Sequence, residues 1–255
     1  MKVDGVEVIV EGAGPRALLM IHGWPDTHRL WDRQVEALKD RYRCVRFTLP
    51  GFEPGAPKQA HSFEALIGTM RRIVEQACPN QPVTLLLHDW GCFFGYQFAM
   101  RHPELVERVI GVDIGDAGSR QHLAEIGASG KLKIVAYQLW LALAWRIGGA
   151  VGDAMARALR APADPGSVRA QMGYAYAMRW LGSAGGFPRL RVFQPHCPML
   201  YLYGERKPVM FHSRAWAERV NARAFPTGHW IMVQRPAEFN AALLAWLAET
   251  DRPRS

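Results

Sequence analysis

Cysteine is scarce in this sequence, with four residues among 255, and no two of them form a C-x-x-C pair. Their wide spacing indicates neither a zinc site nor a disulfide framework, so we expect reduced thiols in the cytoplasm. Long apolar runs are missing too: the longest, Ile134–Trp145, is too short to span a bilayer and ends at Arg146. Residues 1–5 lack the apolar core of a signal peptide, and we expect no export signal.

Acidic residues are fewer than basic ones, and the formal charge at pH 7 is +8. The arginines that carry most of this charge are scattered and form no basic cluster interleaved with aromatics, so we expect no nucleic-acid partner. With 49% apolar and 21% charged residues, the composition is that of a soluble globular protein. We therefore expect a basic, solvated surface, no membrane partner, and a monomer or homodimer.

Short aliphatic runs alternate with amphipathic stretches along most of the chain, as a parallel α/β sheet requires. The inner runs are continuously apolar, which is typical of strands covered by helices on both faces. The helices show apolar residues at spacings of three and four. The predicted strands are Val6–Val10, Ala17–Ile21, Cys44–Thr48, Val83–Leu87, Val109–Ile114, Met199–Tyr203 and Ala222–Phe225. The predicted helices are Leu30–Lys39, Phe63–Ala77, Phe93–Arg101, Ser213–Val220 and Ala237–Ala248.

The strand pattern stops between Ala117 and Arg191, where the sequence is rich in Ala, Met, Trp and Tyr. We interpret this stretch as a helical cap inserted after one strand of the core, and strands resume beyond Pro198. The predicted division is therefore a core formed by residues 1–116 and 191–255, with a cap formed by residues 117–190.

The most informative segment follows the predicted strand Val83–Leu87, where the chain turns through His88 and Asp89 and enters a helix. Such a strand–turn–helix elbow holds one side chain at the carboxyl end of a sheet, and serine hydrolases carry their nucleophile there. Asp89 occupies this position. A carboxylate attacks esters poorly, because the product would be an anhydride, but it can displace a leaving group from saturated carbon and form an alkyl-enzyme ester. The N-terminus of the following helix favours the ionised carboxylate.

The segment at residues 88–91 reads His-Asp-Trp-Gly and resembles the elbow shared by epoxide hydrolases and haloalkane dehalogenases of the α/β-hydrolase superfamily. The resemblance covers nearly the whole chain. It implies an α/β-hydrolase fold, in which a mostly parallel sheet is flanked by helices and carries an inserted helical cap, with Asp89 as the nucleophile. One residue departs from the pattern, since the family usually has a small residue where this sequence has Leu87.

The loop at residues 22–26 reads His-Gly-Trp-Pro-Asp and is similar to the family's His-Gly-X-Pro loop, which faces the nucleophile. The resemblance implies an oxyanion hole made by the backbone N–H groups of Trp24 and Trp90. This oxyanion hole stabilises the charge that develops when water attacks the ester. It also implies that His22, at the floor of the pocket, and Trp24 contact the substrate.

The segment at residues 226–229 reads Pro-Thr-Gly-His, follows a short predicted strand and is similar to the family's catalytic-histidine loop. Of nine histidines, His229 is the only one in such a context near the C-terminus. The resemblance implies that His229 is the base that deprotonates water. By contrast, we interpret His88 as a residue that packs the elbow.

The third member of the triad departs from the family pattern. The family usually places an Asp three residues beyond the glycine that is Gly204 here, and this sequence has Lys207, a cation that cannot orient an imidazolium. Some related dehalogenases take the acid from the end of the strand before the cap, where an ungapped match gives Asp116. Asp113 is the second candidate and Glu205 the third. Strand alternation indicates that Asp113 and Asp116 point differently, so only one of them is expected to serve.

Opening an epoxide leaves an alkoxide, and the family stabilises it with two tyrosines of the cap. Tyr137 begins a Tyr-Gln-Leu-aromatic segment that resembles the one carrying the first, and Tyr176, preferred over Tyr174, matches the second. The alternative is that these tyrosines only pack the cap, since tyrosine is an ordinary amphipathic residue. We further expect Trp140 and Tyr174 to contact the substrate, and the aromatic, Met-rich cap indicates an apolar substituent.

Together these features imply an epoxide hydrolase that acts on a small-molecule substrate, an apolar epoxide, and converts it into a vicinal diol through the Asp89 ester, with no cofactor and no metal. Two alternatives remain open. A haloalkane dehalogenase shares the nucleophile and base, and its halide would rest on the Trp90 indole and a second donor, often an Asn where Trp24 stands here. A non-catalytic ligand-binding homologue would account for Lys207 and Leu87.

Overall fold

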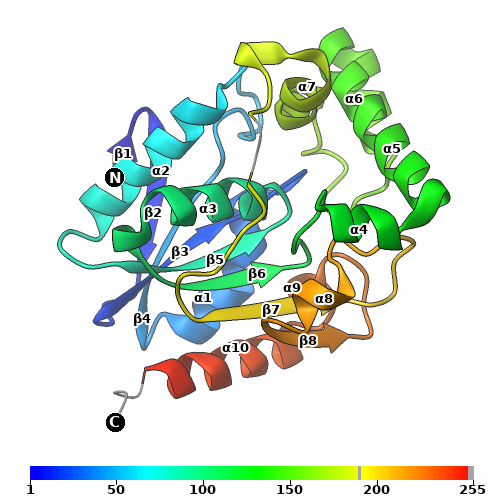
Figure 1. The fold of residues 1–255 in the computed structure, drawn as a ribbon. Coiled ribbons are helices and arrows are strands. Elements are labelled where there is room, and N and C mark those ends of the chain that lie inside the picture. The colour runs from blue at the N-terminus through cyan, green and yellow to red at the C-terminus, as the bar shows by residue number, and fades with distance from the viewer. Residues whose placement is uncertain (189–190, 252–255) are drawn as a thin grey trace.

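The computed structural model describes residues 1–188 and 191–251. At its centre is an eight-stranded sheet with the strand order β1-β2-β4-β3-β5-β6-β7-β8 (Figure 1). β2 pairs antiparallel with β1 and β4, and all other neighbouring strands are parallel. The strands span Lys2–Val3 (β1), Val6–Glu11 (β2), Arg16–Ile21 (β3), Tyr42–Phe47 (β4), Val83–His88 (β5), Val106–Val112 (β6), Met199–Gly204 (β7) and Asn221–Phe225 (β8).

Helices cover both faces of the sheet, because successive side chains of a strand point to opposite faces. In β3, Leu19 and Ile21 belong to the hydrophobic cluster that also holds the buried side chains of α2 and α3. Leu18 and Met20 belong to the cluster formed with α1 and α10 on the other face. Burying each of these side chains stabilises the fold by roughly 1.5–3 kcal/mol. The helices of the core span Asp32–Leu38 (α1), Phe63–Ala77 (α2), Trp90–Arg101 (α3), Arg214–Ala217 (α8), Ile231–Gln234 (α9) and Pro236–Thr250 (α10), with 3-10 turns at His28–Trp31 and Pro103–Leu105.

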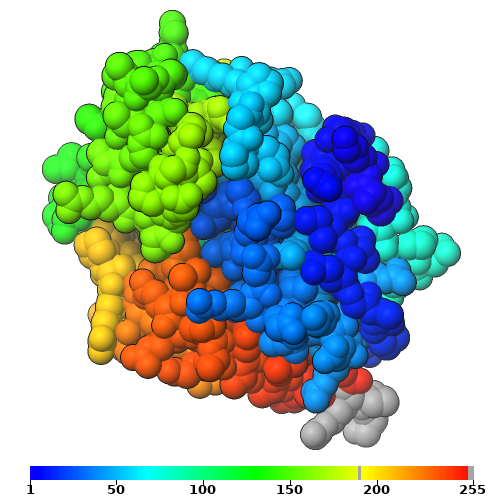
Figure 2. Space-filling view, turned by 180° about the vertical axis from the view of Figure 1, so that it is seen from behind, coloured from blue at the N-terminus to red at the C-terminus, as the bar shows by residue number. Residues whose placement is uncertain are grey.

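Between β6 and β7 the chain leaves the sheet and forms a group of helices beyond the carboxyl ends of the strands (Figure 1). Seen from behind, this green and yellow-green segment forms a lobe that sits on the blue and orange core (Figure 2). The division into core and cap stays a prediction, and its boundary at residue 190 lies outside the described residues. The helices of this segment span Arg120–Glu125 (α4), Gly127–Ile147 (α5), Gly149–Arg157 (α6) and Tyr174–Leu181 (α7), with 3-10 turns at Ala170–Gly173 and Ser183–Gly185.

The α/β fold predicted from the sequence is confirmed, and each predicted strand and core helix corresponds to one in the structure. The pattern did not predict β1, which has only two residues. The predicted strand that ends at Ile114 is too long, since β6 ends at Val112. Among the described residues, no helix combines the length and apolar character needed to cross a membrane. The cytoplasmic location and the oligomeric state stay predictions.

The carboxyl ends of β3, β5, β6, β7 and β8 lie at one edge of the sheet because these strands are parallel. In open α/β sheets this edge is where ligands bind. The loops that follow these five strands contain residues 22–26, Asp89, Asp113, Lys207 and His229. The fold therefore brings together segments that are far apart in the sequence.

Candidate active site

Asp89 lies in the sharp turn between β5 and α3, with φ 52° and ψ −120°. A non-glycine residue at positive φ is strained, and such strain persists where the surrounding packing fixes the turn. Two glycines allow this packing: a Cβ on Gly91 would lie 2.3 Å from the carbonyl oxygen of Ile21, and one on Gly23 would lie 2.3 Å from Asp89 Oδ1. The elbow therefore holds the Asp89 carboxylate at the carboxyl edge of the sheet.

Leu87, the large residue beneath the elbow, fits because α3 has no side chain opposite it. Leu87 is fully buried, and a Cβ on Gly95 would lie 2.4 Å from Leu87 Cδ2. The space that the family usually gains from a small residue on the strand is thus provided by a glycine on the helix.

We expect Gly95→Ala to lower the free energy of unfolding by about 2 kcal/mol, because the new methyl group overlaps Leu87 in a packed core. Gly68→Ala in α2 is the matched control, since its Cβ would meet only the far end of the long Arg72 side chain, at 3.3 Å, rather than packed core atoms. That substitution is expected to be neutral or to stabilise by up to about 1 kcal/mol. Urea unfolding of both variants measures the difference, and equal stability would contradict the packing role of Gly95.

The loop after β3 holds one oxygen of the Asp89 carboxylate. The backbone N–H of Trp24 donates a hydrogen bond to Asp89 Oδ1 over 2.7 Å. The backbone nitrogen of Trp90 lies in the same region, because a Cβ on Gly23 would lie 2.6 Å from this nitrogen and 2.3 Å from Asp89 Oδ1. Oδ1 therefore occupies the position where an oxyanion would form, with Trp24 N–H as its donor, while the contribution of Trp90 N–H stays a prediction.

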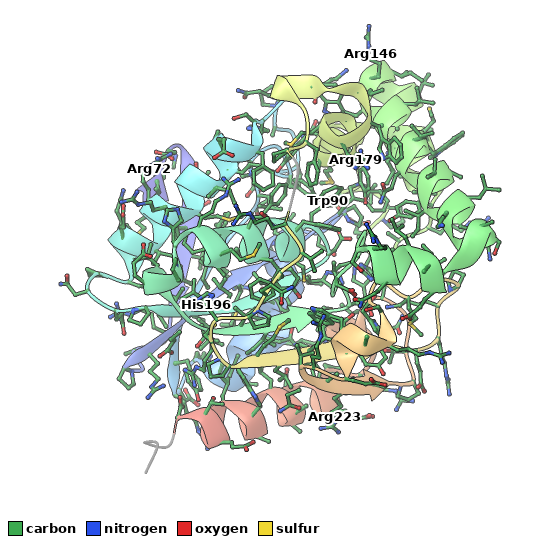
Figure 3. The ribbon with its side chains drawn as sticks, viewed as in Figure 1. Arg72, Trp90, Arg146, Arg179, His196 and Arg223 are labelled. Carbon is green, nitrogen blue, oxygen red and sulfur yellow. The ribbon has the colours of Figure 1, made fainter. Side chains whose placement is uncertain are left out.

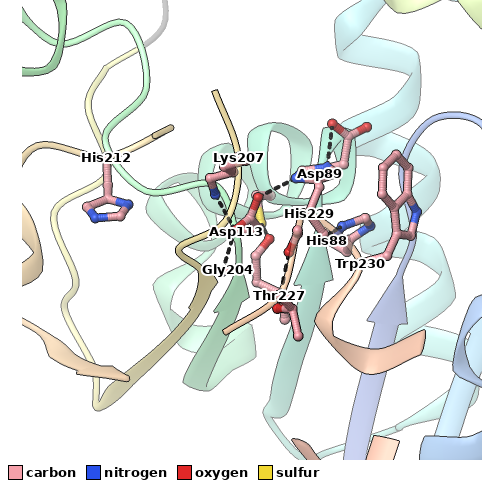
Figure 4. A network of polar contacts seen from close by, with 12 residues as sticks. His88, Asp89, Asp113, Gly204, Lys207, His212, Thr227, His229 and Trp230 are labelled. Atoms are coloured by element: carbon pink, nitrogen blue, oxygen red, sulfur yellow. Dashed lines mark hydrogen bonds and ion pairs between the residues drawn. The ribbon is translucent and has the colours of Figure 1, made fainter. Parts of the chain in front are cut away.

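His229 lies between two carboxylates (Figure 4). Its Nε2 is 3.5 Å from Asp89 Oδ2, and its Nδ1 is hydrogen-bonded to Asp113 Oδ2. The His229 side chain is 15% exposed and Asp113 is fully buried. Asp113 thus occupies the orienting position of a nucleophile–histidine–acid triad.

The prediction that Asp116 orients His229 is wrong. Asp116 is buried and accepts hydrogen bonds from the Ser213 N–H at 2.6 Å, from Ser213 Oγ at 2.8 Å and from Ser119 Oγ at 2.6 Å. The reason lies at the end of β6. The predicted strand continued through Asp113, but β6 ends one residue earlier and Asp113 has φ 67°, so strand alternation no longer sets the direction of its side chain. The third candidate, Glu205, is exposed.

Lys207 also belongs to this network. Its ammonium contacts Asp113 Oδ1, which in addition accepts a hydrogen bond from the Gly204 N–H at 2.9 Å (Figure 4). The Lys207 side chain is only 6% exposed. The lysine at the family's usual acid position is therefore the counterion of the acid that the chain supplies from β6.

The charges of this network hold each member in a defined protonation state. Burial alone would raise the pKa of Asp89, but hydrogen bonding and charge from His229, with the Trp24 N–H, hold it below its usual value. Burial would likewise raise the pKa of Asp113, and His229 and Lys207 lower it. Burial disfavours charged His229, yet Asp113 and Asp89 raise its pKa to about 9. Both carboxylates are thus ionised at neutral pH, and His229 is strongly basic in the free protein.

His88 packs beneath His229 as an uncharged ring. The two ring centroids are 4.5 Å apart, and His88 Nε2 lies 3.1 Å from the His229 carbonyl oxygen. Burial lowers the pKa of His88 to about 3, and the charge of His229 acts in the same direction. A neutral His88 therefore donates its Nε2 proton to that carbonyl and supports the His229 loop from below.

A cavity of about 690 Å³ adjoins Asp89 and lies between the elbow and helices α4, α5 and α7. Tyr137 of α5 and Tyr176 of α7 line it, with their ring centroids 6.2 Å apart. Trp90 lies in the interior between α3 and helices α5 and α7, whereas Arg72 and Arg223 lie at the periphery (Figure 3). The other lining residues are mostly apolar and include Phe93, Ile114, Ile134, Val135, Phe187 and Phe211. The charged ones are the cations Lys131, Arg179 and Arg191 and the carboxylate of Asp116.

Four residues predicted to contact the substrate do not line this cavity. His22 is fully buried and accepts a hydrogen bond from the Leu49 N–H, and Trp24 contributes its backbone rather than its ring. Trp140 is 40% exposed on the outer side of α5, where its indole donates to the Met155 carbonyl at 2.7 Å. Tyr174 is buried against Phe52 and His61.

Asp26 is a residue whose contribution the sequence analysis missed. It accepts a hydrogen bond from the Trp230 indole at 2.9 Å and so ties the His-Gly-X-Pro loop to the residue beside His229. Burial raises the pKa of Asp26 to about 7, with the charge of Asp89 acting in the same direction. Its place at the end of that loop and the tryptophan after the predicted base are the signals that could have indicated this contact.

The chain is similar to several characterised proteins over part of its length. It is 32% identical over 127 residues to the probable oxidoreductase EphD of Mycobacterium tuberculosis, a region that is 47% of this chain and 21% of that protein. It is 32% identical over 105 residues to epoxide hydrolase 1 of Caenorhabditis elegans, covering 40% and 26% of the two chains. These alignments therefore span about a fifth to a quarter of the curated relatives' length.

The structure is similar to that of an epoxide hydrolase from Bacillus megaterium solved with an inhibitor. The TM-score is 0.73 at 19% identity, and the superposition covers 97% of this chain and 99% of the other. At this identity the similarity shows the shared fold. A family model for the alpha/beta hydrolase fold matches residues 16–236, which is most of the sequence. This chain therefore belongs to the alpha/beta hydrolase fold family.

Proposed function

We propose that this protein is an epoxide hydrolase that uses Asp89 as its nucleophile. The observation that carries the proposal is the environment of one carboxylate. Asp89 Oδ1 is held by the Trp24 N–H and Oδ2 faces the His229 imidazole, while the cavity beside it is lined by Tyr137 and Tyr176. An ionised carboxylate next to two phenol groups suits an epoxide, which needs a nucleophile at carbon and a proton donor at oxygen.

In the first step, Asp89 Oδ2 attacks one epoxide carbon and the bond from that carbon to the ring oxygen breaks. The electron pair goes to the oxygen, which takes a proton from Tyr137 or Tyr176. Burial raises the pKa of both phenols well above the usual value, and the Asp89 charge does so further. Both are therefore protonated and able to donate at neutral pH. The product is a hydroxyalkyl ester on Asp89, and solvent returns the proton to the tyrosine.

In the second step, His229 takes a proton from water, and the resulting hydroxide attacks the ester carbon of Asp89. Negative charge develops on Oδ1, where the Trp24 N–H is already in place. Collapse of this intermediate expels the diol oxygen, which takes the proton from His229 and leaves Asp89 as a carboxylic acid. Asp89 then releases its remaining proton to solvent, which restores the carboxylate and balances the proton that solvent gave to the tyrosine. Asp113 stabilises the imidazolium that forms in between, and neither step requires a cofactor or a metal.

The relatives and the cavity support the same assignment. The aligned nematode protein and the Bacillus megaterium protein are both epoxide hydrolases. The apolar walls formed by residues such as Phe93, Ile134 and Phe187 suit an epoxide with an apolar substituent. A haloalkane dehalogenase is the second candidate, since Trp90 lines the same cavity beside Asp89 and its indole N–H is a donor that a halide could use.

Assays with a panel of aryl and alkyl epoxides and matched bromoalkanes test the proposal directly. We expect wild type to convert the epoxides into diols and Asp89→Asn to form no diol. Halide release without diol formation would replace the proposal by a dehalogenase. If wild type turns over neither class and no ester forms on Asp89, the protein is a ligand-binding homologue of the family.

We expect Tyr137→Phe and Tyr176→Phe each to lower kcat/KM for epoxides by about 10- to 100-fold, because each removes one donor to the epoxide oxygen. Together they are expected to lower it about 1,000-fold or more. Tyr174→Phe is the matched control, because the Tyr174 hydroxyl is buried without a partner in the described residues and lies outside the cavity. Equal effects of all three substitutions would contradict the assignment of the two donors.

A further inference from the structure

Lys207 is placed so that it shares one carboxylate with the proposed base. Its ammonium contacts Asp113 Oδ1, while His229 Nδ1 contacts Oδ2 of the same group (Figure 4). Within residues 1–188 and 191–251, Asp113 is the only carboxylate in contact with Lys207. The Gly204 N–H fixes Oδ1 from a third direction. A buried lysine with a single anionic partner is costly unless that contact is kept, so the arrangement is rigid.

The surroundings of Lys207 leave its charge to act mainly on this pair. The Phe211 ring lies 5.5 Å from the ammonium, and His212 is held against the Tyr201 hydroxyl at 2.9 Å. Burial lowers the pKa of His212 to about 4, and Lys207 contributes to this, so that ring is neutral. The ammonium is therefore the positive charge nearest to Asp113 apart from the His229 imidazolium.

The Lys207 ammonium and the His229 imidazolium contact the same carboxylate, that of Asp113, and therefore repel each other. Because Lys207 and His229 contact the two oxygens of one carboxylate, their charges lie close enough for mutual repulsion to destabilise the protonated imidazole, even at an effective dielectric constant of about 20. Without Lys207, His229 would face the full charges of Asp113 and Asp89. A base held between two uncompensated carboxylates keeps its proton and cannot activate water.

We propose that Lys207 is a positioning residue that anchors Asp113 against His229 and, by offsetting the charge of Asp113, makes the imidazole easier to deprotonate. Forming the Asp89 ester removes the second negative charge beside His229. After the first step, the Asp113–Lys207 pair therefore has the main influence on the pKa of His229. The kinetic part of this inference rests on the proposed function, but the effect on the His229 proton does not.

Several charged or titratable groups lie around His229, and each affects the pH at which His229 is expected to titrate. Asp113 and Asp89 favour its protonated form. Lys207 contacts Asp113 Oδ1, and in the proposal its charge opposes the protonated form. His88 beneath the ring is neutral in the working pH range. Asp26 contacts the adjacent Trp230 and becomes negative near pH 7, which favours protonated His229 above that pH. None of these groups is altered by a substitution at position 207, so wild type and variant share this background.

The test is an NMR titration of His229 in Lys207→Met, Lys207→Arg and wild type, with the signal assigned by its loss in His229→Gln. In Lys207→Met we expect the midpoint to move upward by about one pH unit, since a neutral side chain of similar length removes the repulsion. Lys207→Arg keeps the charge and is expected to restore most of the wild-type midpoint. Arg206→Gln, at the exposed neighbouring position, controls for a general change of surface charge.

The same variants are compared in the rate of ester hydrolysis as a function of pH. Because the base must be neutral, the rate rises with pH through the midpoint of His229 in the ester form, which is lower than in the free protein because Asp89 is then uncharged. At pH values below both midpoints, an upward shift of about one pH unit lowers the rate by about tenfold. At pH values above the new midpoint, Lys207→Met is expected to approach the wild-type rate. A merely structural lysine would lower the thermal midpoint of unfolding without moving either pH profile.

An unchanged or lowered His229 midpoint in folded Lys207→Met overturns the inference. If Lys207→Met does not fold, Lys207→Gln is titrated in its place. Failure of both to fold makes the role structural, which also overturns it. A shifted His229 midpoint in a protein that hydrolyses no epoxide would contradict the proposed function and leave the inference intact. Diol formation with an unchanged His229 midpoint would support the proposed function and overturn the inference.

Discussion

His229→Gln incubated with an epoxide is expected to accumulate a covalent ester on Asp89 that adds the full mass of the epoxide to the protein. The first step needs only the ionised Asp89 carboxylate and the two tyrosines, and these remain in the variant. The second step needs a base, and glutamine cannot take a proton from water. Hydrolysis of the ester is therefore expected to slow by at least about 100-fold, which makes the adduct visible by intact-protein mass spectrometry.

The control for this result is Asp89→Asn, in which the amide cannot attack carbon and no adduct is expected. Peptide mapping should place the added mass on the peptide that contains Asp89. A bromoalkane would add only its alkyl group in exchange for hydrogen, so the measured mass also identifies the class of leaving group. An adduct on another residue, or one that persists in Asp89→Asn, would contradict the assignment of the nucleophile.

Asp113→Asn is expected to lower kcat on the order of 1,000-fold, because the amide no longer stabilises the imidazolium or fixes its tautomer. The alkylation step is expected to be nearly unchanged, so the ester should accumulate in this variant as it does in His229→Gln. Stopped-flow measurement of burst and steady-state phases separates the two steps. Lys207 keeps a hydrogen-bond acceptor at position 113, and calorimetry checks that the variant is folded under the assay conditions.

Asp116→Asn is the matched control, since it makes the same chemical change three residues away. Asp116 contacts Ser213 and Ser119 rather than His229, so we expect kcat to fall by less than tenfold. Lost hydrogen bonds to the charged carboxylate are expected to lower the free energy of unfolding by about 1–3 kcal/mol. A larger loss of kcat in Asp116→Asn than in Asp113→Asn would show that the acid predicted from the sequence is the one used.

The fold and the segments that carry the site could be predicted from the sequence because their signals are local. The apolar strand that runs into His-Asp-Trp-Gly predicts an elbow, and the structure has that turn at Asp89 with φ 52°. The His-Gly-X-Pro loop and the Pro-Thr-Gly-His segment follow strands in the same way. A short run of residues limits its own backbone conformations, so these features need no knowledge of distant contacts.

The departures from the family pattern could be seen in the sequence but not interpreted from it. Leu87 stands where the family usually has a small residue, and only the packing against Gly95, eight positions further along, shows how the large side chain fits. Lys207 suggested a damaged triad, and only the tertiary structure pairs it with Asp113. In both cases the compensating residue lies on another element, and no local pattern connects the two.

The sequence by itself determined the fold class, the elbow that presents Asp89 and the loop that supplies His229, because periodicity and turn chemistry are properties of neighbouring residues. The tertiary structure decided which acid meets the base, since Asp113 and His229 are 116 positions apart and β6 ends one residue before Asp113. It likewise decided that Tyr137 and Tyr176 line the cavity while Tyr174 and Trp140 do not. Which face of a helix borders a cavity depends on how the helices pack, and that is fixed by the whole chain.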